Sequence, residues 1–306
     1  MLTRFTKRSL LLGIPFMLIM LLNYIVDPFN YNNAFQIGFD KEAISWRMNY
    51  RLFAILKYKE AKIPNILIGD SRTALISTSE IKKVSGDAYF NFSYGSASLP
   101  ECIETFWYAA DLTKLEKVYL GVPFNLFSAT NSKNIFSQAR RIAASSLDYY
   151  LNFYIFRASI YNILYFALHI NLASENPNMP RDEFWESLLI ASADTYNTYS
   201  WPQNYIAELF KIKRYCAKMK ITLIIIIPPT HVDLQKQVDV HHLRQEYENY
   251  KKSLRSIAPV IDYDTSNDIT ASRANFKDPY HFNVTVMKRL VREIWGGKSS
   301  EGEGNH

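Results

Sequence analysis

Five short apolar segments, each bounded by residues typical of turns, constrain the fold of this chain more than any other feature. In chain order they are Asn65–Ile68, Ala88–Phe92, Lys117–Gly121, Ile221–Ile227 and Pro259–Tyr263. Runs of this length and composition are typical of strands buried inside a sheet. Helix-like stretches lie between them, and strands that alternate with helices form a mostly parallel sheet covered on both faces. The sequence therefore predicts an α/β fold with a mostly parallel five-stranded sheet.

Local signals for helix starts support this alternation. Ser77 and Glu80 have the spacing of a capping box. Pro100 stands where the first turn of a helix tolerates proline. Asn283 can cap a last helix that carries one apolar face. Two further helices are expected over residues 203–219 and 243–257.

The N-terminus predicts a membrane anchor. Residues 10–26 form an apolar run of 17 residues without a formal charge, preceded by Arg4, Lys7 and Arg8. At 1.5 Å per residue, this run is at the short end of what crosses a hydrocarbon core. The preceding basic residues predict a cytoplasmic N-terminus and an extracytoplasmic body. Because no small-x-small site follows the run, an uncleaved signal anchor is favoured over a signal peptide, and a buried core helix is the other alternative.

These features predict three regions. Residues 1–30 form a cytoplasmic stub with the transmembrane anchor, residues 31–296 an extracytoplasmic domain, and residues 297–306 a flexible tail. About a hundred residues separate the third and fourth predicted strands, so we expect a helical insertion at about 136–200 over the mouth of the sheet. Polar residues interrupt its aromatic stretch, 149–172. That stretch is therefore expected to be a buried cap, or a surface facing a membrane or a partner, rather than a second span.

Composition excludes several classes of protein. The chain is 48% hydrophobic and 21% charged, so it has enough apolar surface to fold. A net charge of +6, half of it from the first eight residues, does not favour nucleic acid as a partner. Two cysteines, Cys102 and Cys216, either form one bridge or stay free. No Cys/His set has zinc spacing and no glycine-rich loop is suited to phosphate, so neither a metal nor a cofactor is predicted.

Two motifs far apart in the chain carry the candidate chemistry. Gly69-Asp70-Ser71 follows the first predicted strand, which places a hydroxyl at the carboxyl edge of a parallel sheet, where ligands bind. Asp278 and His281 lie three residues apart after the fifth strand. In that spacing a carboxylate can hold one imidazole N–H and leave the other nitrogen as the base that a serine nucleophile requires. Each motif alone is more often a helix cap or a surface turn.

Together the motifs resemble the SGNH (GDSL-like) hydrolase superfamily. The chain has the Gly-Asp-Ser block ending at Ser71, then Gly95 in NFSYGSAS, and then the late pair Asp278 and His281, in the family's order. The resemblance covers most of residues 62–296 apart from the insertion, and it implies a three-layer flavodoxin-like fold. It also implies that Ser71 is the nucleophile, His281 the general base and Asp278 its orienting partner. The backbone N–H groups of Ser71 and Gly95 would then belong to the oxyanion hole.

The chain departs from the family at the third block, where an asparagine usually completes the oxyanion hole. After the third predicted strand it reads Gly-Val-Pro-Phe-Asn, so Asn125 lies two residues late. Asn125, Asn91 or a backbone amide are the candidates for this donor, and Asn125 as an ordinary loop residue is the alternative. Arg72 and His231 are candidate substrate-binding residues. Their alternatives are an ion pair with a nearby acid for Arg72 and a solvated loop position for His231.

A single N-terminal anchor and a divergent third block resemble membrane-anchored proteins of bacterial cell-surface glycan O-acylation, such as those of alginate O-acetylation and of D-alanyl transfer in teichoic acid synthesis. This implies a serine O-acyltransferase on the periplasmic side of the inner membrane that modifies a surface polysaccharide through an acyl-Ser71 intermediate. The implied partners are the membrane, an acyl donor, a glycan acceptor and a multi-span membrane acyltransferase. A carbohydrate or lipid esterase and a non-catalytic assembly partner are the alternatives.

Overall fold

The computed structural model describes residues 2–35, 41–169 and 179–297, and the chain divides into two compact units. Unit 1 draws on Met1–Ala61 and Ile135–Pro177, and unit 2 on Lys62–Asn134 and Asn178–His306. Residues 31–61 therefore group with the N-terminal helix, and the segment predicted as one insertion is divided between the two units. The predicted tail lies outside the described residues except for Gly297.

Unit 2 contains a five-stranded sheet in the order β2-β1-β3-β4-β5, in which every pair of neighbours is parallel. This confirms the predicted α/β fold with its parallel sheet. The chain turns from β1 to β2 on one side and returns to β3 on the other. The carboxyl ends of β1 and β3 therefore flank the topological switch point, where α/β sheets bind their ligands. The strands are β1 (Asn65–Ile68), β2 (Phe90–Asn91), β3 (Lys117–Gly121), β4 (Thr222–Ile227) and β5 (Val260–Asp262).

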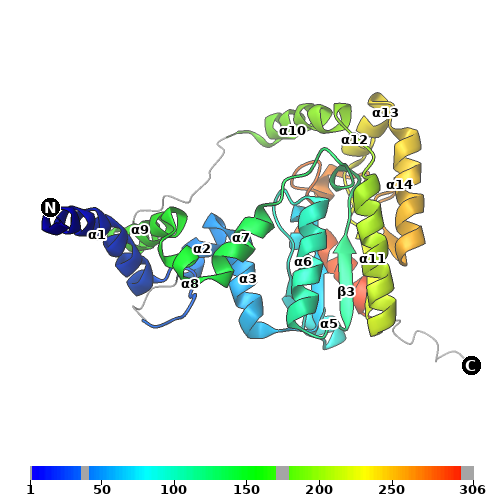
Figure 1. The fold of residues 1–306 in the computed structure, drawn as a ribbon. Coiled ribbons are helices and arrows are strands. Elements are labelled where there is room, and N and C mark those ends of the chain that lie inside the picture. Colours follow the sequence, from blue (N-terminus) through cyan, green and yellow to red (C-terminus); the bar gives the residue numbers. More distant parts are fainter. Residues whose placement is uncertain (1, 36–40, 170–178, 298–306) are drawn as a thin grey trace, which may run out of the picture. The chain divides into compact units, whose positions relative to one another are not determined.

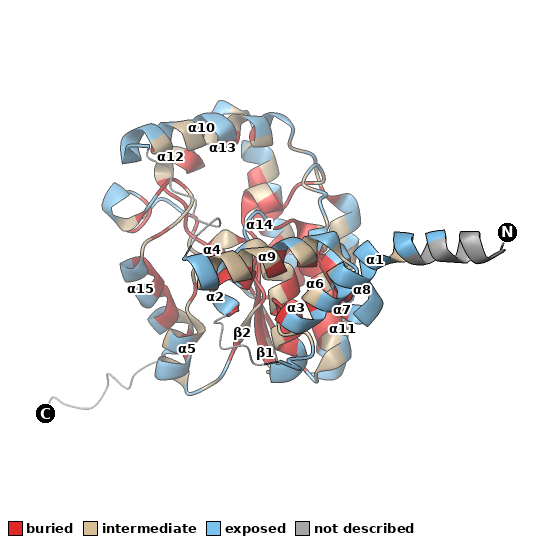
Figure 2. Cartoon of the chain, turned by 90° about the vertical axis from the view of Figure 1, so that its left-hand side faces the viewer, coloured by how far each residue is buried: buried red, intermediate tan, exposed pale blue. Residues whose placement is uncertain are grey.

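Helices cover both faces of this sheet, which makes three layers. Figure 1 shows α6 and α11 in front of β3, and Figure 2, turned by 90°, shows α5 and α15 on the other side of β1 and β2. The two caps predicted from sequence are present: the side chains of Ser77 and Asn283 accept backbone N–H groups at the starts of α5 and α15. Ser98 caps α6 in the same way, with Pro100 in its first turn as expected. The main covering helices are α5 (Thr78–Ser85), α6 (Leu99–Leu112), α11 (Gln203–Met219), α14 (Arg244–Ile257) and α15 (Val284–Trp295).

The strand side chains reach the two faces alternately. Leu67 of β1, Tyr119 of β3 and Ile226 of β4 share one buried cluster with Ile81 of α5 and Trp295 of α15. The residues between them on the same strands are buried as well, which explains why the sequence shows apolar runs without alternation. These residues are Ile66, Ile68, Val118, Leu120, Ile225 and Ile227.

Unit 2 contains further elements between these strands and helices. They are α4 (Ser71–Ala74), the 3₁₀ turn η1 (Phe124–Leu126), α10 (Arg181–Asn197), α12 (Val232–Gln235), α13 (Gln237–Val240) and the 3₁₀ turn η2 (Arg273–Asn275). Cys102 and Cys216, on α6 and α11, are both free and buried. Burial raises the pKa of the Cys216 thiol to about 12, so this thiol stays protonated at neutral pH.

Unit 1 is helical, and buried polar contacts join its N-terminal helix to the later helices. Asn23 Nδ2 donates to the Tyr150 carbonyl over 2.8 Å, and Ser159 Oγ donates to Asn23 Oδ1 over 2.9 Å. Tyr149 Oη donates to Asp27 Oδ1 over 2.9 Å. The helices are α1 (Leu2–Val26), α2 (Glu42–Met48), α3 (Tyr50–Ala61), α7 (Ile135–Ala144), α8 (Ser146–Tyr150) and α9 (Phe153–Leu168).

The sequence predicted a transmembrane anchor at the N-terminus, and the structure does not show one. Residues 10–26 do belong to a helix, α1, but within the described parts of the chain no helix combines the length and the apolar character that crossing a membrane requires.

The first turn of α4 packs closely against the sheet. A Cβ atom built on Gly121, the last residue of β3, would lie 1.9 Å from Thr73 Oγ1, and one built on Gly69 would lie 2.4 Å from the same atom. Both glycines are therefore required for the first turn of α4 to rest on the ends of β1 and β3. That contact determines where Ser71, the first residue of α4, is held.

We expect Gly121→Ala to destabilise the protein by about 1–3 kcal/mol, the usual cost of overpacking. Thr73→Ala should largely restore stability in the double variant, because it removes the hydroxyl that the new methyl group meets. Thr73 Oγ1 has no hydrogen-bond partner among the described residues, so this second substitution breaks no hydrogen bond. Urea unfolding measures both effects, and Gly95→Ala is the control because a Cβ there meets nothing within 4 Å. If the losses in the free energy of unfolding from Gly121→Ala and Thr73→Ala add up in the double variant, this packing argument is contradicted.

Candidate active site

The structure brings together the serine and the histidine of the two motifs. Ser71 Oγ lies 2.7 Å from His281 Nε2, although the two residues are 210 positions apart. Ser71 starts α4 immediately after β1, and His281 lies in the loop between η2 and α15. His281 Nδ1 lies 2.7 Å and 2.9 Å from the two carboxylate oxygens of Asp278. The three side chains thus form one hydrogen-bonded row at the carboxyl edge of the sheet.

The loop that carries His281 is held by the Asp278 side chain and by a backbone hydrogen bond from His231. Asp278 Oδ1 accepts the N–H groups of Tyr280 and His281 over 2.8 Å and 3.0 Å. The backbone N–H of His231 donates to the Pro279 carbonyl over 3.0 Å. The same carboxylate therefore shapes the turn and orients the imidazole ring.

The charge state of Asp278 follows from these contacts. Burial raises its pKa, but the hydrogen bond and charge of His281 and the two backbone N–H donors outweigh burial and hold the pKa below the ordinary value of 3.8. An ionised carboxylate only accepts hydrogen bonds, so His281 Nδ1 must carry a proton. In neutral His281, Nε2 is then free to accept the proton of the Ser71 hydroxyl.

Arg72 and Asp70, on either side of the serine, form a buried pair. Asp70 Oδ1 caps α4 by accepting the Arg72 backbone N–H over 3.0 Å, and Asp70 Oδ2 accepts from Arg72 Nε over 2.9 Å and from Nη2. Arg72 Nη2 also donates to Asn125 Oδ1 over 2.5 Å. Burial lowers the pKa of Arg72, but the charge and hydrogen bond of Asp70 outweigh this effect and keep the pKa raised.

A cavity of about 480 Å³ opens beside this row of side chains. Ser71, Arg72, Asn125 and His281 line one part of it. The rest of the wall is rich in hydroxyl and amide groups from the loops after β2 and η1 and from the C-terminal end of α10. These groups belong to Ser96, Thr130, Asn131, Thr195 and Thr198, and the same part of the wall also carries the amine of Lys133 and the carboxyl group of Asp194. Sequence reasoning missed all of them, because isolated polar residues in loops carry no periodic or spacing signal.

His231, which the sequence predicted to bind substrate, lies elsewhere. His231 does not line this cavity: its ring packs against Trp185 and Phe276, and its Nδ1 accepts the Asp233 backbone N–H at the start of α12. The structure therefore does not place His231 at this cavity.

Two further predictions concern residues that are already engaged. Arg72 lines the cavity, but its guanidinium binds Asp70 and Asn125, as the alternative reading of the sequence expected. Asn91 donates to the carbonyls of Thr73 and Ile76 and lies outside the cavity wall, so it is not the third oxyanion donor.

The remaining predicted donors lie at or near the cavity. Asn125 is half-buried in η1 and lines the cavity. Gly95 is exposed and directly precedes Ser96 and Ala97, which line it. The role of Gly95 in an oxyanion hole stays a prediction.

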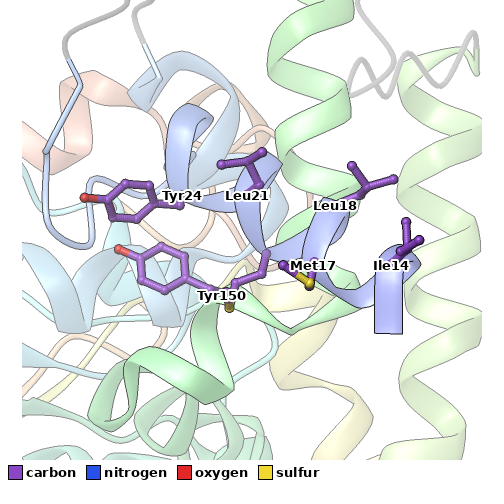
Figure 3. A pocket seen from close by; sticks show the side chains of 7 residues that line it. Ile14, Met17, Leu18, Leu21, Tyr24 and Tyr150 are labelled. Atoms are coloured by element: carbon purple, nitrogen blue, oxygen red, sulfur yellow. The ribbon is translucent and has the colours of Figure 1, made fainter. Parts of the chain in front are cut away.

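Unit 1 has a second, apolar cavity of about 560 Å³. Figure 3 shows Ile14, Met17, Leu18 and Leu21 along one side of α1, with the rings of Tyr24 and Tyr150 beside one another. The residues that line it include no acid, base or nucleophile suited to catalysis. This cavity therefore offers a surface for apolar contact rather than a reaction centre.

Comparisons with known proteins found structural neighbours only. No family model and no curated protein matches the chain. A candidate acylhydrolase from Bacteroides fragilis is 12% identical, with a TM-score of 0.40 over 79% of this chain and 95% of the other. A candidate platelet activating factor from Streptococcus pneumonia is 11% identical, with a TM-score of 0.40 over 83% and 94%. A GDSL-like lipase from Bacteroides thetaiotaomicron is 11% identical, with a TM-score of 0.40 over 81% and 95%.

The lowered pKa of Asp278 predicts how stability depends on pH. Because the folded pKa lies below the unfolded one, ionised Asp278 stabilises the fold above the ordinary carboxyl pKa, and this contribution is lost as the pH falls through the folded pKa. Between about pH 5 and pH 2, the free energy of unfolding should therefore fall more steeply for the wild type than for Asp278→Asn. Urea unfolding at a series of pH values measures both curves. Parallel curves would show that Asp278 has no depressed pKa.

Proposed function

We propose that this protein is a serine acyl-transfer enzyme of the SGNH type that forms an acyl-Ser71 intermediate. The observation that carries the proposal is the row of Ser71, His281 and Asp278, with separations of 2.7 Å between adjacent functional atoms. A serine hydroxyl is a weak nucleophile until a neighbouring base takes its proton, and this row supplies both the base and the group that orients it.

The geometry supports a reaction in two halves. Ser71 Oγ attacks the carbonyl carbon of an ester while His281 Nε2 takes the hydroxyl proton, and Asp278 stabilises the imidazolium that forms. The tetrahedral intermediate collapses, the C–O bond to the leaving alcohol breaks, and His281 returns the proton to that alcohol. In the second half, the hydroxyl of an acceptor gives its proton to His281 and attacks acyl-Ser71. The bond between the acyl group and Ser71 Oγ then breaks, the new ester leaves, and His281 returns the proton to Ser71 Oγ.

The proposed oxyanion hole consists of the backbone N–H groups of Ser71 and Gly95 and the side-chain amide of Asn125. Negative charge develops on the carbonyl oxygen only as the tetrahedral intermediate forms. Donors fixed at that position therefore lower the barrier, typically by about 3–4 kcal/mol for one of them. Asn125 supports this assignment because it lines the same cavity as Ser71 and His281.

We propose that the acceptor is a hydroxyl of a cell-surface polysaccharide. The cavity wall offers hydroxyl and amide groups from Thr130, Asn131, Thr195 and Thr198, and such groups suit the many hydroxyls of a sugar. If water attacks acyl-Ser71 instead, the same machinery is an esterase. A non-catalytic assembly protein is the third candidate, but it would not require a hydrogen-bonded row beside an open cavity.

We also propose that the protein works against a membrane, which α1 contacts. Leu12 and Phe16 are 73% and 62% exposed, and other large apolar side chains along α1 are exposed as well. An exposed apolar surface of this kind marks contact with a lipid or a partner. The periplasmic side of the bacterial inner membrane and a multi-span acyltransferase partner stay predictions.

The first test is covalent labelling. We expect a fluorophosphonate probe to label Ser71 in the full-length wild type, and an acetyl ester to be hydrolysed. Ser71→Ala should lose both activities. The control is Ser79→Ala, which removes an exposed hydroxyl on α5. Adding an oligosaccharide acceptor and following its acetylation by mass spectrometry separates transfer from hydrolysis. Absence of labelling at Ser71 in the wild type would rule out the covalent mechanism.

The second test is binding of the full-length protein to vesicles of phosphatidylethanolamine and phosphatidylglycerol. The double variant Leu12→Ser with Phe16→Ser should bind at least about tenfold more weakly, because a buried apolar side chain contributes roughly 1.5–3 kcal/mol. Ile190→Ser is the matched control, since Ile190 is 73% exposed but lies on α10 of unit 2. Equal binding of wild type and double variant in a co-sedimentation assay would remove the membrane contact from the proposal.

A further inference from the structure

The Arg72 guanidinium donates hydrogen bonds to two side chains of the protein, Asp70 and Asn125. The residue is only 2% exposed, its Nε lies 2.9 Å from Asp70 Oδ2, and its Nη2 lies 2.5 Å from Asn125 Oδ1. The ring of Tyr280 lies beside the guanidinium, with 5.6 Å between the ring centroid and the guanidinium carbon. The positive charge of Arg72 is thus compensated by protein groups rather than offered to a substrate anion.

The chemistry of arginine determines which way the Asn125 amide points. A guanidinium has N–H donors and no acceptor, so the Asn125 atom that faces it must be the carbonyl oxygen. The amide nitrogen, Nδ2, must then occupy the other arm of the planar group. Asn125 lines the same cavity as Ser71, so Nδ2 is the donor that this amide can offer to a reacting group there.

We propose that Arg72 is a positioning residue that fixes Asn125 with Nδ2 available to the oxyanion formed when Ser71 attacks. The inference rests on the proposed function, and it adds the residue that orients the oxyanion donor. Because Arg72 directly follows Ser71 in α4, one helical turn positions both the nucleophile and the side chain that holds the donor. Asp70, which caps that turn, holds the guanidinium in place.

The backbone of η1 is held independently, so Arg72 acts on the side chain of Asn125. Phe124 stacks on Tyr199 with ring centroids 4.7 Å apart. Tyr250 Oη donates to the Val122 carbonyl over 2.5 Å. These contacts bring Asn125 to the cavity despite its late position in the sequence, and Arg72 then determines the orientation of its amide.

The test is a double-mutant cycle on ester hydrolysis by the full-length protein. Asn125→Ala should lower kcat by about 10²–10³-fold with little change in KM, because the donor acts only in the transition state. Arg72→Lys should lower kcat by about 10²-fold, a typical loss when a reacting group is misplaced by about 1 Å. In the Asn125→Ala variant, adding Arg72→Lys should lower kcat no further. If kcat in the double variant falls by the product of the two single-variant losses, the inference is overturned.

A second variant keeps the inference testable if Arg72→Lys fails to fold. Asn125→Asp preserves the contact with Arg72 but replaces Nδ2 by an oxygen, so kcat should fall at least as far as in Asn125→Ala while thermal stability is retained. Wild-type kcat in Asn125→Asp would show that Nδ2 donates nothing. Arg244→Lys is the control, since Arg244 forms an exposed pair with Asp239 and should keep wild-type kcat. Failure of the wild type to label at Ser71 would instead reject the proposed function.

Discussion

The close contact between α4 and the ends of β1 and β3 is the constraint on which the rest of the site depends. Gly69 and Gly121 leave room for Thr73, so the first turn of α4 rests directly on the sheet. The register pairs Ile68 with Leu120, and the two strands therefore end at the same level beneath that turn. A single side-chain methyl group at either glycine would lift the turn and move Ser71 with it.

From that turn, two different contacts reach the other parts of the site. Ser71 meets His281, whose loop is shaped by Asp278, and Arg72 meets Asn125 in η1. The proposed nucleophile, base and oxyanion donor thus come from three separate segments of the chain at one edge of the sheet. Since Asp278 orients both its own turn and the imidazole, and Asp70 both caps α4 and holds Arg72, each carboxylate links backbone shape to side-chain position.

Sequence alone predicted the central strands better than the edge strands. Both β1 and β3 have their predicted bounds, whereas β2 and β5 are shorter than predicted. Central strands are paired on both sides, so their length follows from the apolar run, but an edge strand lacks one partner and its length depends on where pairing stops. The division into two units was not predicted, because it rests on contacts such as that of Asn23 with Tyr150, which are distant in sequence.

The site shows the same contrast between pattern and packing. The position of Ser71 after a strand and the spacing of Asp278 and His281 placed these residues at one edge, and there they meet. His231 also follows a strand at that edge, yet its ring is buried against Trp185 and Phe276. Strand order tells which edge a residue occupies. It does not tell whether the side chain turns into the cavity or into the core.

The proposed chemistry and the proposed acceptor recognition are built from different segments. The reacting row comes from the loops after β1 and β5, whereas much of the cavity wall comes from Thr130 to Lys133 and from the end of α10, both between β3 and β4. This segment contributes no member of the reacting row. Its side chains can therefore determine which hydroxyl reaches acyl-Ser71, a sugar or water, without altering the proton transfers. In the proposed reaction, substrate choice is thus a property of the wall rather than of Ser71, His281 and Asp278.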